Sequence, residues 1–159
     1  MPNVFRSISD SEYEQLLDAV PLVAILVGAA DDNFDSVEKE WAKKIVHIRS
    51  FAYDAGLRPF YKDLDSVFES RLSEIWKSLP VKTADRNKII VDRLSALNSV
   101  LPRLNPMIAS ALYEGLLDFA EQVARASGGF LRMLSVSYDE SEWLGLPMLD
   151  PVFPLDEEE

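Results

Sequence analysis

The sequence contains no cysteine in its 159 residues and a single histidine. The absence of cysteine excludes disulfide frameworks, thiolate zinc sites and cysteine nucleophiles. His47 lies beside Ile45 and Ile48, so we expect it to be a half-buried structural residue of a helix. One histidine also excludes a histidine-based metal centre within one chain.

Long apolar runs and a leader pattern are lacking as well. The longest apolar stretch, from Val20 to Ala30, is far short of the roughly 20 residues that span a bilayer. The first residues, Met1 to Ser7, show no basic-then-apolar signal pattern. We therefore expect a soluble, cytoplasmic protein without a transmembrane segment.

Positive charge is scarce relative to negative charge. Lysine and arginine number 16 against 27 aspartates and glutamates, which gives a net charge of −11. The electrostatic field of this negative charge repels the phosphates of nucleic acids, so we expect no nucleic-acid binding. It favours cations or basic partner surfaces, although acidic charge also serves simply to keep a protein soluble.

Helical periodicity dominates the rest of the sequence, and no run of Val, Ile or Thr alternates as a strand does. We predict an all-α fold, a compact bundle of about seven helices. Residues 1–146 are expected to form a single domain, followed by a proline-containing acidic tail at 147–159. The predicted helices are Ser9–Val20, Leu22–Ala29, Asp35–Ala55, Pro59–Leu79, a helix to Leu101 that is capped near Thr83 or Asp85, Pro106 to the glycines at 128–129, and Ser137–Leu144.

Two of the predicted helices begin in the same way. Glu-Lys-Glu-Trp at 38–41 and Glu-Ser-Glu-Trp at 140–143 each start three residues after a capping residue, Asp35 or Ser137. The two tryptophans, Trp41 and Trp143, are expected to pack into the core. We interpret the two segments as an internal pseudo-repeat, whose second copy has about six extra residues in the preceding turn.

The stretch Ala-Asp-Asp-Asn-Phe-Asp-Ser-Val-Glu at 30–38 resembles the signature of the TerB-like (tellurite-resistance-protein-B-like) domains. Asp32 departs from the pattern, because the family usually has glycine there. The resemblance implies a compact seven-helix domain with a pseudo-repeat. It also implies a link with bacterial stress and metal-resistance systems, and divalent-cation binding by clustered carboxylates. The residues that match the signature are Asp31, Phe34, Asp35 and Glu38.

The acidic turn in this stretch is the candidate metal site. Carboxylate oxygens suit calcium, magnesium or manganese, but the spacing is not that of an EF-hand, because the twelfth position from the first aspartate is Ala42. The turn is either a weak divalent-cation site or a set of acidic side chains that stabilise a helix N-terminus. No other cofactor is expected. The candidate ligands are Asp31, Asp32, Asp35 and Glu38, with Glu140 from the second copy.

The extra residues of the second copy form the candidate partner-binding segment, Leu131, Arg132 and Met133. These residues either fold back on the core or form an exposed partner-binding patch.

No phosphate loop, dinucleotide fingerprint or nucleophile elbow occurs in the sequence. We therefore expect a non-enzymatic helical interaction module, TerB-like, that binds a protein partner or further copies of itself. It is expected to bind divalent cations weakly and to be linked to a bacterial stress response. The alternative is a metal-assisted enzyme or cation sensor that uses the turn from Asp31 to Glu38.

Overall fold

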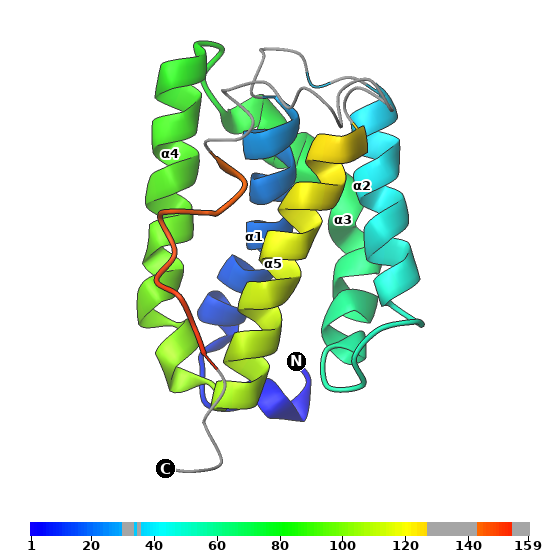
Figure 1. Cartoon of the computed structure of the whole chain (residues 1–159), viewed down its shortest axis with the longest axis vertical. Helices are drawn as coiled ribbons and strands as arrows, with labels where there is room; N and C mark the ends of the chain where they lie inside the picture. The colour runs from blue at the N-terminus through cyan, green and yellow to red at the C-terminus, as the bar shows by residue number, and fades with distance from the viewer. Residues whose placement is uncertain (30–33, 35, 127–142, 154–159) are drawn as a thin grey trace.

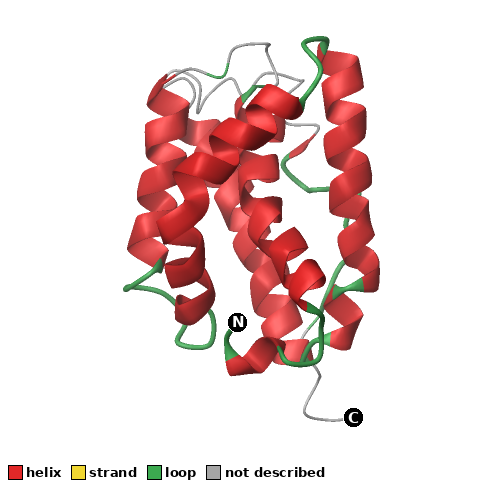
Figure 2. Ribbon diagram, turned by 180° about the vertical axis from the view of Figure 1, so that it is seen from behind, coloured by secondary structure: helices red, strands yellow, loops and turns green. Residues whose placement is uncertain are grey.

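The computed structural model describes residues 1–29, 34, 36–126 and 143–153. Within these residues the chain is all-helical, as predicted, with five α-helices and no strand (Figures 1 and 2). The helices are α1 (Asp10–Gly28), α2 (Ser36–Arg49), α3 (Arg58–Ser78), α4 (Thr83–Ser95) and α5 (Pro106–Ala126). Three short 3₁₀ turns accompany them, namely η1 (Asn3–Phe5), η2 (Ala96–Ser99) and η3 (Leu101–Arg103).

The helix α1 forms the centre of the bundle and contacts all four of the other helices. α2 packs against α3 and α5 on one side, and α4 packs against α1 on the opposite side (Figure 1). The segment 143–153 runs alongside α4, where Asn98 bonds the carbonyl of Met148 at 2.9 Å and the amide of Asp150 at 2.8 Å. None of the helices in the described part of the chain is long and apolar enough to cross a membrane.

The start of α1 was predicted correctly, but its end was not. Ser9 and Glu12 form the expected capping box, with bonds of 2.9 and 3.1 Å between side chain and backbone. The sequence predicted a new helix after Pro21, whereas α1 continues through Pro21 to Gly28. A proline inside a helix costs about 3 kcal/mol. Burial of every side chain from Leu22 to Val27 outweighs that cost.

Two further helices are shorter than predicted. α2 ends at Arg49 rather than at Ala55, and the Ser50 hydroxyl donates to the carbonyl of His47 at 2.5 Å. α4 ends at Ser95, and the turns η2 and η3 follow it, whereas one helix to Leu101 was predicted.

The predicted count of about seven helices is not confirmed. The first two predicted helices are a single helix, and the predicted helix Ser137–Leu144 lies almost entirely outside the described residues. The pseudo-repeat is not confirmed either, because the second copy also lies mostly outside the described residues. The two tryptophans that anchor it differ, since Trp143 packs partly buried against the core while Trp41 is 44% exposed.

Candidate functional site

Most of the residues predicted to form a site lie outside the described residues. These are Asp31, Asp32, Asp35 and Glu140 of the metal prediction and Leu131, Arg132 and Met133 of the partner prediction. Glu38 is described, and its side chain is buried at the start of α2 with 2% exposure. No group of three His, Asp or Glu residues suited to a metal ion occurs among the described residues, so the metal site stays a prediction.

The buried face of α2 differs from the one that was predicted. The expected face comprised Val37, Trp41, Ile45, Ile48, Ala52 and Ala55, and of these only Ile45 is buried. The prediction was therefore wrong about the rotation of this helix, whose buried face is turned by about one residue. The side chains that α2 buries are Glu38, Ala42, Ile45, Val46 and Arg49.

A buried arginine accounts for this rotation. Arg49 is 5% exposed at the end of α2, and its Nη1 atom donates to the Tyr61 hydroxyl at 2.8 Å and to the Gly115 carbonyl at 3.0 Å. Its guanidinium lies 4.7 Å from the ring centroid of Tyr53, 5.3 Å from that of Tyr61 and 5.8 Å from that of Phe119. We call these five residues the Arg49 cluster.

The aromatic faces and the carbonyl take the place of a carboxylate in the Arg49 cluster. Among the described residues Arg49 forms no ion pair, and a cation buried in this way is stabilised by ring quadrupoles and backbone dipoles. Burial raises the pKa of Tyr61 to about 12, although the neighbouring guanidinium of Arg49 lowers it. The cluster joins α2, α3 and α5, and it fixes which side of α2 faces outward.

The outward side of α2 carries apolar side chains in a line. Val37 is 63% exposed, Trp41 44% and Ile48 41%, and Phe51, just beyond the helix, is 60% exposed. With Lys44 these residues recur at steps of four and three, so they lie along one side of the helix. We call Val37, Trp41, Lys44, Ile48 and Phe51 the α2 stripe.

A positive charge lies within the α2 stripe, although the chain as a whole is acidic. Three lysines of α2, Lys39, Lys43 and Lys44, are at least partly exposed, against one exposed glutamate, Glu40. Lys44 lies 5.4 Å from the ring centroid of Trp41, and Lys43 pairs with Glu69 of α3 at 3.0 Å. Lys44 therefore adds a positive charge within the stripe, in a chain whose net charge is −11.

The lower part of the stripe is bordered by a histidine. The Nδ1 atom of His47 lies 2.9 Å from a carboxylate oxygen of Asp65, and its ring centroid is 5.5 Å from that of Phe51. The prediction of a half-buried His47 is therefore wrong, because the side chain is 63% exposed. His47 lies at the surface because the rotation of α2 places its side chain beside α3 rather than in the core.

Comparison of the chain with protein-family models, with curated proteins and with solved structures gives no match. The resemblance to the TerB-like domains therefore stays a prediction. Within the described residues, the structure supports the coarser class, an all-helical bundle in which α2 exposes a line of apolar side chains.

Proposed function

We propose that the protein is a non-enzymatic helical interaction module whose α2 stripe binds an acidic amphipathic helix of another protein. The observation that carries the proposal is the exposure of Val37, Trp41, Ile48 and Phe51 along one side of a single helix. Scattered apolar residues on a surface are ordinary, but a continuous line of them is typical of a protein interface.

The spacing of the stripe supports a helical partner. Residues that recur at alternating steps of four and three form the narrow seam along which two helices pack. A large aromatic residue in the middle of such a seam is the residue type that most often dominates binding energy. Trp41 therefore serves as the central anchor, with Val37 on one side and Ile48 and Phe51 on the other.

The charges support an acidic partner rather than a second copy of this chain. A symmetric pair that met through α2 would place the lysines of one copy beside those of the other, and like charges at an interface are unfavourable. Glutamates or aspartates that flank an apolar seam would instead pair with Lys44. Such pairing also steers the two proteins together at low ionic strength.

Two synthetic helical peptides test this proposal. Both carry the same leucine seam, and glutamates flank it in one peptide while lysines flank it in the other. We expect the acidic peptide to bind at least roughly tenfold more tightly, as measured by fluorescence anisotropy, because electrostatic complementarity of this size is worth more than 1.4 kcal/mol. The Trp41→Glu variant should lose this binding, since it removes the anchor and adds a repelling charge.

Two isoleucines with nearly equal exposure provide a matched control. Ile48 in the stripe is 41% exposed and Ile89 on α4 is 40% exposed. A photo-crosslinking amino acid at position 48 should capture a partner in the native cell that Trp41→Glu abolishes, whereas position 89 should not. Equal capture at both positions, equal affinity for both peptides, or a dimer of the free chain joined through α2 would overturn the proposal.

A further inference from the structure

A second surface feature is the segment 143–153, which we call the strap. It runs alongside α4, on the side of the bundle away from α2 (Figure 1). Residues 144–153 contain no helix or strand, and the backbone instead turns twice. The amide of Leu146 donates to the carbonyl of Trp143 at 2.9 Å, and the amide of Leu149 donates to the carbonyl of Leu146 at 3.0 Å. The strap is therefore an irregular peptide that lies on a helical bundle.

Two leucines anchor the strap in the bundle. Leu146 is 0% exposed and Leu149 is 3% exposed, and both belong to the hydrophobic core, whereas every other residue of the strap is partly or fully exposed. Apolar residues in and next to η2 belong to the same core and are each 1% exposed, namely Leu97, Val100 and Leu101. Deep burial of two apolar side chains from an otherwise exposed segment is typical of the way protein surfaces bind short peptides.

One side chain of the bundle binds the backbone of the strap at two points. The Nδ2 atom of Asn98, in η2, donates to the carbonyl of Met148 at 2.9 Å. Its Oδ1 atom accepts from the amide of Asp150 at 2.8 Å. A side-chain amide that bonds a carbonyl and the amide two residues further on fixes the register of a peptide through its main chain. We call Asn98 and the surface that buries the two leucines the strap site.

The strap is bound in a conformation that leucine rarely adopts. Leu146 has a φ angle of 42°, the only positive φ outside glycine among the described residues. Left-handed backbone is unfavourable for a residue with a Cβ atom, and it persists only where its surroundings hold it. Burial of the Leu146 side chain and the two bonds to Asn98 hold it here. Release of the strap relaxes this strain, so the bound and released forms lie closer in free energy than the buried leucines alone imply.

We propose that the strap site is a peptide-binding site, which the chain's own strap occupies and which accepts the strap of a second copy in its place. The identical segment makes the same bonds to Asn98 and buries the same two leucines, so the exchange needs no new complementarity. The tether to its own bundle favours the strap of the same chain at low protein concentration. The strap site lies away from the α2 stripe and does not depend on the proposed partner binding.

Two complementary full-length variants test the exchange. Leu146→Asp with Leu149→Asp, the strap variant, disables the strap and leaves the strap site intact, while Asn98→Glu disables the site and leaves the strap intact. We expect each variant alone to be a monomer and an equimolar mixture to form a 1:1 dimer in sedimentation velocity, because the strap of one chain fills the vacated site of the other. A mixture that stays monomeric up to roughly millimolar concentration, the order of a tethered segment's effective concentration, would overturn the proposal.

A neighbouring serine provides the matched control for the mixture. Ser99 is exposed and follows Asn98, so Ser99→Glu adds the same charge while the strap site stays intact and occupied. Its affinity for the strap variant should be at least roughly tenfold weaker than that of Asn98→Glu, because its own strap stays bound. Equal dimer formation by both would refute the role of the strap site.

Native-state hydrogen exchange tests release of the strap without altering its leucines, so the proposal stays testable if the strap variant does not fold. In the unaltered chain we expect the amide of Asp150 to be protected at least roughly hundredfold less than that of Ile25 in α1, because the strap opens without unfolding of the bundle. Asn98→Asp should lower the protection of Asp150 roughly tenfold further. Asn105→Asp should not, since an aspartate there still accepts from the amide of Met107. Equal protection of Asp150 and Ile25 would show that the strap opens only with global unfolding, and the proposal would fail.

Discussion

Two buried arginines hold different parts of this bundle together, and they do so in related ways. Arg49 is 5% exposed and Arg86 is 3% exposed, and each donates to a backbone carbonyl, of Gly115 and Ala29 respectively. Arg49 is surrounded by three aromatic rings and joins α2, α3 and α5. Arg86 stacks on Trp76 and lies in the wall of an open cleft.

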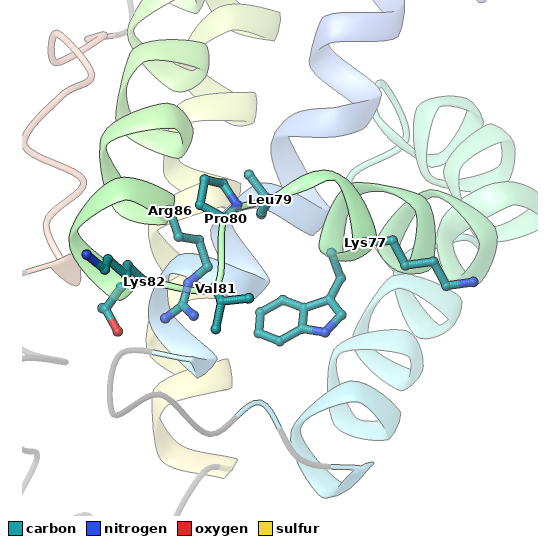
Figure 3. Close-up of a pocket in the computed structure, with 8 residues that line it drawn as sticks. Lys77, Leu79, Pro80, Val81, Lys82 and Arg86 are labelled. Carbon is teal, nitrogen blue, oxygen red and sulfur yellow. The ribbon is translucent and has the colours of Figure 1, made fainter.

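The difference lies in what surrounds each guanidinium. Arg49 is enclosed by three aromatic rings, and its bonds to α3 and α5 hold α2 in one rotation. Arg86 instead stacks on a single ring, that of Trp76, and lines a cleft between α3 and α4 (Figure 3). The comparison therefore separates an arginine enclosed by three rings from one that lines a cleft.

Removal of each arginine should give the largest difference between the two regions. Arg49→Ala should lower the free energy of unfolding by about 3 kcal/mol, because it leaves a cavity between the rings and an unsatisfied carbonyl. Arg86→Ala should lower it by less, because Arg86 packs on one ring rather than three and water from the neighbouring cleft can fill the space that it leaves. Urea denaturation measures both values, and equal losses would contradict the distinction.

Alkaline pH should weaken the Arg49 cluster next. Burial raises the pKa of Tyr61 from 10.0 to about 12, and it raises the pKa of Tyr53 as well. The folded state then keeps phenolic protons that the unfolded state loses, so stability is complete below pH 10 and falls as pH rises toward 12. The loss should be roughly 1 kcal/mol per pH unit for each such tyrosine.

The variant Tyr61→Phe provides the check on this pH dependence. It removes one of the titrating groups, so its free energy of unfolding should fall less steeply between pH 10 and pH 12 than that of the unaltered chain. Chemical denaturation at pH 9, 10, 11 and 12 gives both curves. Parallel curves would show that Tyr61 does not contribute.

The smallest effect concerns the glycine that allows the cluster to close. A Cβ atom at Gly115 would lie 2.9 Å from the Tyr53 hydroxyl and 3.4 Å from the Tyr61 hydroxyl. Gly115→Ala should therefore cost about 1 kcal/mol despite the better helix propensity of alanine. In a Tyr53→Phe background the same change should be neutral or stabilising, because the closest atom is gone. A thermal-unfolding cycle of the four proteins measures this coupling.

Local features of this fold could be predicted from sequence, and features that depend on distant packing could not. The capping box at Ser9 and the start of α3 near Pro59 are set by neighbouring residues, so their patterns were informative. Pro21 misled because proline is typical of a helix start, whereas burial of the segment Leu22–Val27 on all sides keeps α1 continuous through it.

The candidate site shows the same limit. α2 has two overlapping sets of apolar residues at helical spacing, and the larger side chains of Trp41 and Ile48 favoured the wrong one. The choice depends on Arg49, which reaches a carbonyl of α5 that lies far along the chain. The local signal for the correct face was Arg49, a basic residue that shares one side of the helix with Ala42, Ile45 and Val46. This signal misled, because an arginine favours exposure of the side that carries it. The cleft beside Arg86 likewise depends on how α3 and α4 meet.

The central position of α1 has a consequence for how the protein is made. α1 is synthesised before α3 and α5, the two helices that cover most of its apolar surface. α5 ends at Ala126, and synthesis at about 5–20 residues per second takes roughly 5–20 s to reach it from Gly28. During that time the nascent chain exposes its most hydrophobic helix at the ribosome, so chaperone binding to α1 is expected while the protein is being translated.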